Sequence, residues 1–191
     1  MFKTAIKGLT AGISCLAAGS VPALAQAPVT YSVVIPAGEF GSAAFLSEML
    51  ATLAAAKAFC RAAGDPALNV DCLSERLETA ADGIPDGTDY DEVRGVLQET
   101  SQRLKRLARQ NSDPTRGRVT VTSSANPAER TSRPLTAVSS VAQAAVNQEA
   151  VRILEEAATV LLRSAEAAQE RQTQYAQIAA AIDSNKVLLR S

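Results

Sequence analysis

Residues 135–189 read LTAVSSVAQAAVNQEAVRILEEAATVLLRSAEAAQERQTQYAQIAAAIDSNKVLL. The stretch contains neither glycine nor proline, and apolar residues recur through it in alternating steps of three and four. A repeat of 3.5 residues is typical of a helix that packs against other helices along its length. The repeat passes through nine residues that we call the seam: Val151, Leu154, Ala158, Leu161, Ala165, Ala168, Tyr175, Ala179 and Ile182.

The seam predicts a long, coiled-coil-like C-terminal helix within residues 135–191. Gln172 and Lys186 interrupt it, either because they face solvent or because polar residues fix the register of the packed helices. One straight helix of this length would reach roughly 75–80 Å at 1.5 Å per residue, and the helices predicted before it are shorter. Either the helix bends back on itself, or one end projects and seeks a partner.

Two shorter helices with a cysteine each are predicted upstream. The first spans residues 42–63 and ends before Gly64, and the second begins at Asp65 and runs to about residue 81. An antiparallel hairpin of these helices can bring Cys60 and Cys72 together. We therefore predict a structural disulfide, which would contribute about 3 kcal/mol by restricting the unfolded chain. A redox-active pair and two unpaired thiols are the alternatives, but catalytic dithiols usually follow a Cys-x-x-Cys pattern.

A third helix is predicted to follow Thr88, with acidic residues in its first turn and basic residues in its last turns. This order complements the helix dipole. The third helix and the hairpin together make up residues 42–110. Residues 111–134 are rich in Ser, Thr, Pro and Arg and predict a long mobile loop. The predicted fold class is an all-α helical bundle, in which the disulfide-tied hairpin and the third helix pack on the C-terminal helix.

The first 25 residues have the three parts of a secretory signal peptide. Two lysines precede an apolar run over residues 8–18, and an Ala-Leu-Ala triplet follows. Small residues at Ala23 and Ala25 suit signal peptidase, which would leave Gln26 as the new N-terminus. Residues 26–41, rich in Val, Thr and Tyr, predict an extended arm. We expect a bacterial protein that is periplasmic or secreted after cleavage.

Two other interpretations of the N-terminus exist. An uncleaved membrane anchor would need about 20 apolar residues, and the apolar run is shorter than that. A lipoprotein signal would be cut just before Cys15, but Gly12 stands where such signals carry leucine. Either alternative would leave the chain attached to a membrane.

Charge is divided unevenly along the chain, although the net charge is only −1. Residues 39–99 carry 12 acidic and 4 basic side chains, whereas residues 101–134 carry 8 basic and 2 acidic side chains. The overall balance argues against a general nucleic-acid binder. The basic segment could contact an anion such as a lipid head group or acidic polysaccharide, or its bases could pair with the acidic residues 39–99. The candidate anion contacts are Arg116, Arg118, Arg130 and Arg133.

The residues needed for common catalytic sites are missing from the sequence. Without histidine, neither a Ser–His–Asp nor a Cys–His arrangement can form, and no phosphate-binding glycine motif is present. We expect no catalytic residues, no metal and no cofactor. The leading hypothesis is a non-enzymatic interaction protein of the bacterial cell envelope that binds itself or another protein through its C-terminal helix. The alternatives are an anion-binding envelope protein, which could touch a membrane surface without spanning it, and a periplasmic chaperone or secretion-system subunit.

Overall fold

The computed structural model describes residues 43–190, except 124–125, 127 and 167–168. The chain divides into two units, residues 1–32 and residues 33–191, and every described residue lies in the second. The predicted signal peptide, its cleavage residues Ala23, Ala25 and Gln26, and the arm over residues 26–41 lie outside the described residues.

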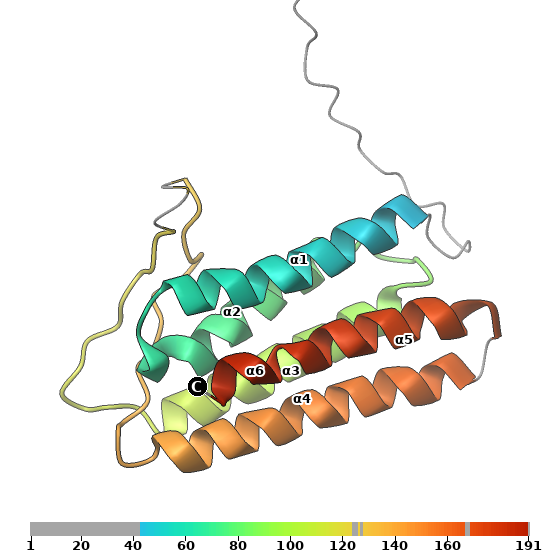
Figure 1. Ribbon diagram of the computed structural model, residues 1–191. Helices are drawn as coiled ribbons and strands as arrows, with labels where there is room; N and C mark the ends of the chain where they lie inside the picture. Colours follow the sequence, from blue (N-terminus) through green and yellow to red (C-terminus); the bar gives the residue numbers. More distant parts are fainter. Residues whose placement is uncertain (1–42, 124–125, 127, 167–168, 191) are drawn as a thin grey trace, which may run out of the picture. The chain divides into compact units, whose positions relative to one another are not determined.

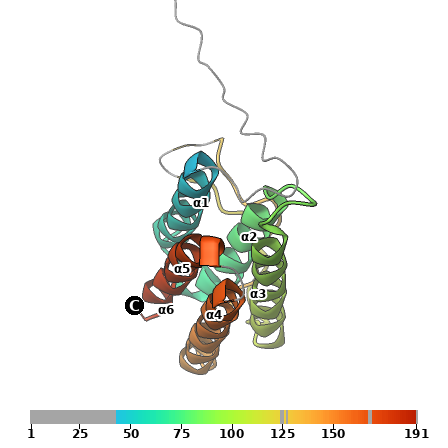
Figure 2. The ribbon, with the colours of Figure 1, turned by 90° about the vertical axis from the view of Figure 1, so that its right-hand side faces the viewer.

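The described residues form helices with no regular β-strand among them, which confirms the all-α bundle (Figure 1). The helices are α1 (Ala43–Ala62), the short 3₁₀ turn η1 (Pro66–Leu68), α2 (Asn69–Asp82), α3 (Asp91–Gln110), α4 (Gln143–Glu166), α5 (Gln169–Ser184) and α6 (Lys186–Leu189). Each long helix from α1 to α5 packs on the next along the chain, and α5 packs back on α1. Figure 2 shows these helices arranged around a common centre.

The α1–α2 hairpin forms where the sequence predicts it. Gly64 follows α1 with a φ of +71°, a conformation that glycine adopts without steric penalty. Asp65 then caps η1, because its carboxylate accepts a hydrogen bond of 3.0 Å from the Ala67 amide. The disulfide between Cys60 and Cys72 is confirmed, with 5.8 Å between the two Cα atoms.

The C-terminal stretch folds back on itself. Helix α4 ends at Glu166, α5 begins at Gln169, and the two pack against each other as antiparallel neighbours (Figure 1). Of the two possibilities left open for the long C-terminal helix, the one in which it bends back on itself is therefore the one observed. The same repeat serves both limbs because each limb buries one apolar stripe.

Residues 135–142 are not helical, although we predicted that the C-terminal helix begins at Leu135. Their backbone is engaged elsewhere: Leu135 exchanges hydrogen bonds of 3.0 and 2.8 Å with Val119, and the Val138 amide donates to the Ala67 carbonyl at 2.9 Å. The Thr136 amide donates to the Asp71 carboxylate at 2.6 Å. These bonds hold the segment against α2 in an extended path, so α4 begins only at Gln143.

The seam lies in the core. Leu154, Leu161, Tyr175 and Ile182 are completely buried, and Ala158, Ala165 and Ala179 are nearly so. Val151 is partly buried and packs against the same core, while Ala168 lies outside the described residues. Gln172 is exposed, and Lys186 forms ion pairs with Glu155 and Asp183. The seam is therefore buried by helices of the same chain, through contacts among α1–α5.

Candidate functional site

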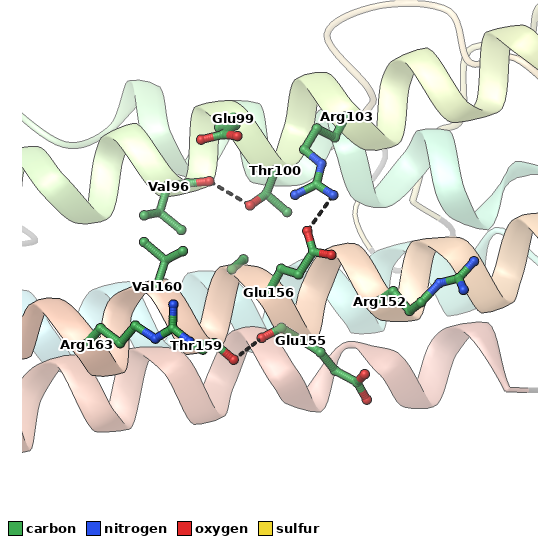
Figure 3. A pocket seen from close by; sticks show the side chains of 11 residues that line it. Val96, Glu99, Thr100, Arg103, Arg152, Glu155, Glu156, Thr159, Val160 and Arg163 are labelled. Carbon is green, nitrogen blue, oxygen red and sulfur yellow. Dashed lines mark hydrogen bonds and ion pairs between the residues drawn. The ribbon is translucent and has the colours of Figure 1, made fainter.

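A groove of about 470 Å³ runs between α3 and α4 (Figure 3). Val96 from α3 and Val160 from α4 point toward each other across it, and Ala157 also lines it. Charged and hydroxyl side chains complete the lining: Glu99, Thr100, Arg103, Arg152, Glu155, Glu156, Thr159 and Arg163. The groove thus combines a narrow apolar strip with charges of both signs.

Polar contacts bridge α3 and α4 on both sides of this apolar strip. Arg103 on α3 forms an ion pair of 2.6 Å with Glu156 on α4. Glu92, in the first turn of α3, accepts a hydrogen bond from Ser164 near the end of α4. Polar side chains therefore join α3 and α4 along this stretch. Because these side chains do not pack as closely as apolar ones, an open groove remains between the two helices.

A second hollow, of about 350 Å³, lies on the other side of α4, toward α5. Leu162, Thr159 and Glu155 line it from α4, and alanines line it from α5: Ala176, Ala179 and Ala180. Helix geometry explains why both hollows flank α4. Leu161 points into the core, and its two neighbours stand about 100° to either side of it. Val160 and Leu162 are consequently 45% and 46% exposed.

The outward face of α4 is a surface that the sequence interpretation did not identify. The seam was expected to make helix contacts, and it does so inside this chain. The usable signal was the apolar run Val160–Leu162, because three consecutive apolar residues cover more of a helix than one buried stripe needs. Among the described residues, no cluster of His, Cys, Asp and Glu could hold a metal ion.

The four candidate anion-binding arginines divide into two pairs. Arg116 forms an ion pair with Asp65, and Arg133 pairs with Asp71 and Glu78. For these two arginines, the structure agrees with the alternative prediction that bases of residues 101–134 pair with acidic residues of 39–99. Arg118 and Arg130 are exposed, and neither forms an ion pair with a described residue. The structure therefore does not gather the four guanidinium groups around one site.

Two buried carboxylates of α2 hold the loop after α3 in place. Asp71 accepts hydrogen bonds of 2.8 and 3.0 Å from the Arg133 guanidinium. Glu75 accepts bonds from the neighbouring Arg76 and, at 2.7 Å, from the Ser132 amide. Burial disfavours the Arg133 cation, but its bonds to Asp71 and Glu78 outweigh burial and raise the pKa of this guanidinium. The segment that we predicted as a mobile loop is thus anchored to the bundle.

Further arginines lie at the end of the bundle where α1 and α3 end and the loop begins (Figure 1). Arg61, Arg106 and Arg109 are exposed there, and none forms an ion pair with a described residue. Asp65 binds Arg116, which lowers the pKa of the Asp65 carboxyl, and Glu78 binds Lys105 and Arg133. Asp113, just after α3, accepts hydrogen bonds from Thr115. The three arginines outnumber this carboxylate, so this end of the bundle carries excess positive charge.

No described helix has the length and apolar character needed to cross a membrane. Comparisons with known proteins add no further constraint, since no family model, no curated protein and no solved structure matches this chain.

Proposed function

We propose that this chain is an exported, non-enzymatic interaction protein of the bacterial cell envelope, and that it associates through the outward face of α4. The carrying observation is that Val160 and Leu162 stand half exposed beside two hollows, while the seam of the same helix is buried. Exposed aliphatic side chains next to a groove, surrounded by charges, are typical of a protein-binding surface.

The closed core supports this choice of surface. The seam cannot receive a partner without separation of α4 from α5, because its described side chains are buried or partly buried by this chain's own helices. On the outward face, a partner could cover Val160 and Leu162 and meet charges of both signs around them. We therefore still propose association through the C-terminal stretch by helix–helix contact, but through the outward face of α4 and not through the seam.

The compartment in the proposal rests on two features. A disulfide such as Cys60–Cys72 persists in oxidising compartments and is rare in the bacterial cytosol. The N-terminal sequence has the order of charged, apolar and small residues that signal peptidase cleaves. Both features favour a periplasmic or secreted protein, and the second also favours an N-terminus at Gln26 after cleavage.

Site-specific photo-crosslinking in intact cells tests the proposal. A photoreactive amino acid is placed at Val160 and, as the control, at Gln98, which is exposed on α3 but does not line the groove. We expect a crosslinked product from position 160 and none from position 98. Mass spectrometry of the recovered protein should show an N-terminus at Gln26. Equal crosslinking at both positions, or an uncleaved cytosolic chain, would contradict the proposal.

A second candidate function, anion binding, is favoured by the exposed arginines at the α1 and α3 ends. The test uses vesicles that contain phosphatidylglycerol. Because one arginine near an anionic surface contributes about 1 kcal/mol, we expect Arg106→Ala with Arg109→Ala to weaken binding at least tenfold. Arg163→Ala, on α4 away from this end, is the control. Absence of wild-type binding, or equal binding by the double variant, would exclude this candidate.

A further inference from the structure

We propose that the partner of the α4 face is a second copy of this chain, packed antiparallel along α4 about a two-fold axis between Thr159 and Val160. This inference rests on the proposed function, because it names the occupant of the same surface. Three observations carry it: the spacing of the outward residues, the order of their charges, and the position of the exposed aliphatic side chains.

The outward residues of α4 form a ridge opposite the seam. Leu154, Ala158 and Leu161 face the core, so helical geometry directs a second set of residues to the other side. This ridge consists of exposed residues spaced three or four apart, Arg152, Glu156, Thr159 and Arg163, with Glu155 beside Glu156. Spacing of this kind allows two helices to pack along their ridges.

The order of charges along the ridge is self-complementary only when two copies are antiparallel. A two-fold axis between Thr159 and Val160 lies midway between Glu156 and Arg163 and sets Glu156 of each copy opposite Arg163 of the other. Symmetry makes this pair twice, as an isologous interface requires. A parallel arrangement in register would instead place each charge opposite its own copy, which is unfavourable.

The present partners of these charges leave them available for the second copy. Arg163 forms no ion pair with a described residue. The Glu156 side chain is 58% exposed although it binds Arg103, so one of its oxygens can accept a further hydrogen bond. Glu156 would then stand between two guanidinium groups, one from each copy.

The same axis brings the exposed aliphatic side chains together. A two-fold axis in the plane of contact places each side of the ridge beside the same side of the other copy. Val160 of both copies would border the contact on the side of the α3 groove, and Leu162 of both copies would border it on the side of the α5 hollow. Both side chains would lose part of their exposure to water, which supplies the apolar part of the association.

Sedimentation equilibrium of the mature chain over a range of concentrations tests this inference. We expect the wild type to pass from monomer to dimer as concentration rises. Val160→Glu should raise the dissociation constant at least about tenfold, because it puts a charge where the second copy would cover an aliphatic side chain and adds a like charge beside Glu156. Val141→Glu is the matched control, since Val141 is 97% exposed and lines neither hollow, and it should leave the constant unchanged.

A charge exchange makes the test specific for the antiparallel pair. Arg163→Glu and Glu156→Arg, each alone, should give monomers, because each sets like charges opposite each other. An equimolar mixture of the two variants should restore the dimer mass. Circular dichroism confirms that both variants are folded. Disulfide crosslinking tests the same arrangement and leaves these charges intact. The Thr159→Cys variant should form a disulfide with a second copy of itself under mild oxidation, whereas Thr52→Cys on α1 should not.

Three results would overturn the inference: a wild type that stays monomeric at millimolar concentration, a dimer that Val160→Glu leaves intact, or a variant mixture that stays monomeric. A monomer that still crosslinks a foreign envelope protein through position 160 would overturn the second-copy assignment alone. Absence of any product at position 160 in cells would instead count against the proposed function itself.

Discussion

At the scale of single residues, burial separates ion pairs that look alike in the sequence. Arg116 and Arg133 both come from the basic segment, and each binds an aspartate of the α1–α2 region. Asp65 is partly exposed, so water shares the solvation of its charge. Asp71 is completely buried and depends on Arg133 and the Thr136 amide. The two pairs should therefore differ strongly in their contribution to stability.

We predict that Arg133→Ala lowers the free energy of unfolding by about 3 kcal/mol, because it leaves the buried Asp71 carboxylate without its counter-charge. Arg116→Ala, which removes an exposed pair, should leave the urea midpoint nearly unchanged. Urea unfolding followed by circular dichroism measures both. Equal midpoints for the two variants would contradict the assigned roles of these arginines.

Tyr90 gives a prediction about alkaline pH. Its side chain is buried, packs against Phe45 with 4.7 Å between ring centroids, and donates a hydrogen bond to Gln174. Burial raises the pKa of Tyr90 to about 12, and Tyr175 and Asp89 act in the same direction. In the unfolded chain this hydroxyl ionises near pH 10. The folded state therefore holds its proton more tightly between these two pH values.

The sign follows from proton linkage. The stabilisation is complete below pH 10 and is lost as the pH rises toward 12, by an amount on the order of 2–3 kcal/mol. Tyr90→Phe should lose less stability than the wild type over the same interval. Chemical unfolding at pH 9, 10, 11 and 12 measures the difference, and parallel curves for the two proteins would refute the assignment.

At the scale of helices, neighbouring leucines on α4 have different environments. Leu161 is completely buried in the core, whereas Leu162 is half exposed beside the α5 hollow. We predict that Leu161→Ala costs 2–5 kcal/mol through lost packing and the remaining cavity, about the usual range for a buried leucine. Leu162→Ala should change stability by roughly 0.5 kcal/mol or less. The reverse order in urea unfolding would mean that α4 is rotated about its axis.

The disulfide joins α1 to α2 beside a small apolar cluster that includes Phe59, Leu68 and Leu135. We predict that the double variant Cys60→Ala with Cys72→Ala loses about 3 kcal/mol, because the unfolded chain regains the freedom of a short closed loop. The comparison is made under oxidising and reducing conditions. The reductant should destabilise the wild type and leave the variant unaffected; an equal effect on both would point to another cause.

Local signals in the sequence were sufficient for the first half of the bundle. Gly64, Asp65 and Pro66 define the hairpin turn, and both cysteines lie near that turn. The fold-back between α4 and α5 has no such signal, because no glycine or proline lies between Glu166 and Gln169. A seam repeat has the same form whether the packed helix belongs to this chain or to another, so periodicity alone could not distinguish the two.

The start of α4 shows a second limit. Residues 135–142 are composed like the helix that follows, yet tertiary hydrogen bonds to Val119, Ala67 and Asp71 keep them extended. The outward face of α4 could not be predicted from the sequence, because it too depends on tertiary packing. Which apolar residues of α4 remain exposed depends on where α3 and α5 pack, and that is a property of the whole bundle.

At the scale of the whole described bundle, closure of the core and exposure of the α4 face are linked. Because α5 returns along α4 and also reaches α1, the seam is satisfied inside one chain. What remains outside is a charged ridge with an aliphatic side chain on each flank. The proposed association and its proposed symmetry both depend on this fold-back, since a straight C-terminal helix would expose the seam itself.

The separation between positions 152 and 190 tests the fold-back most directly. Arg152 and Arg190 are exposed and line one hollow together with Val151 and Leu189. Spin labels on Arg152→Cys and Arg190→Cys report this distance by pulsed electron paramagnetic resonance, with unlabelled protein in excess to suppress signals between molecules. We predict a distribution at the short end of the measurable range. A distance near 57 Å, which 38 residues would span at about 1.5 Å each in one straight helix, would contradict the account.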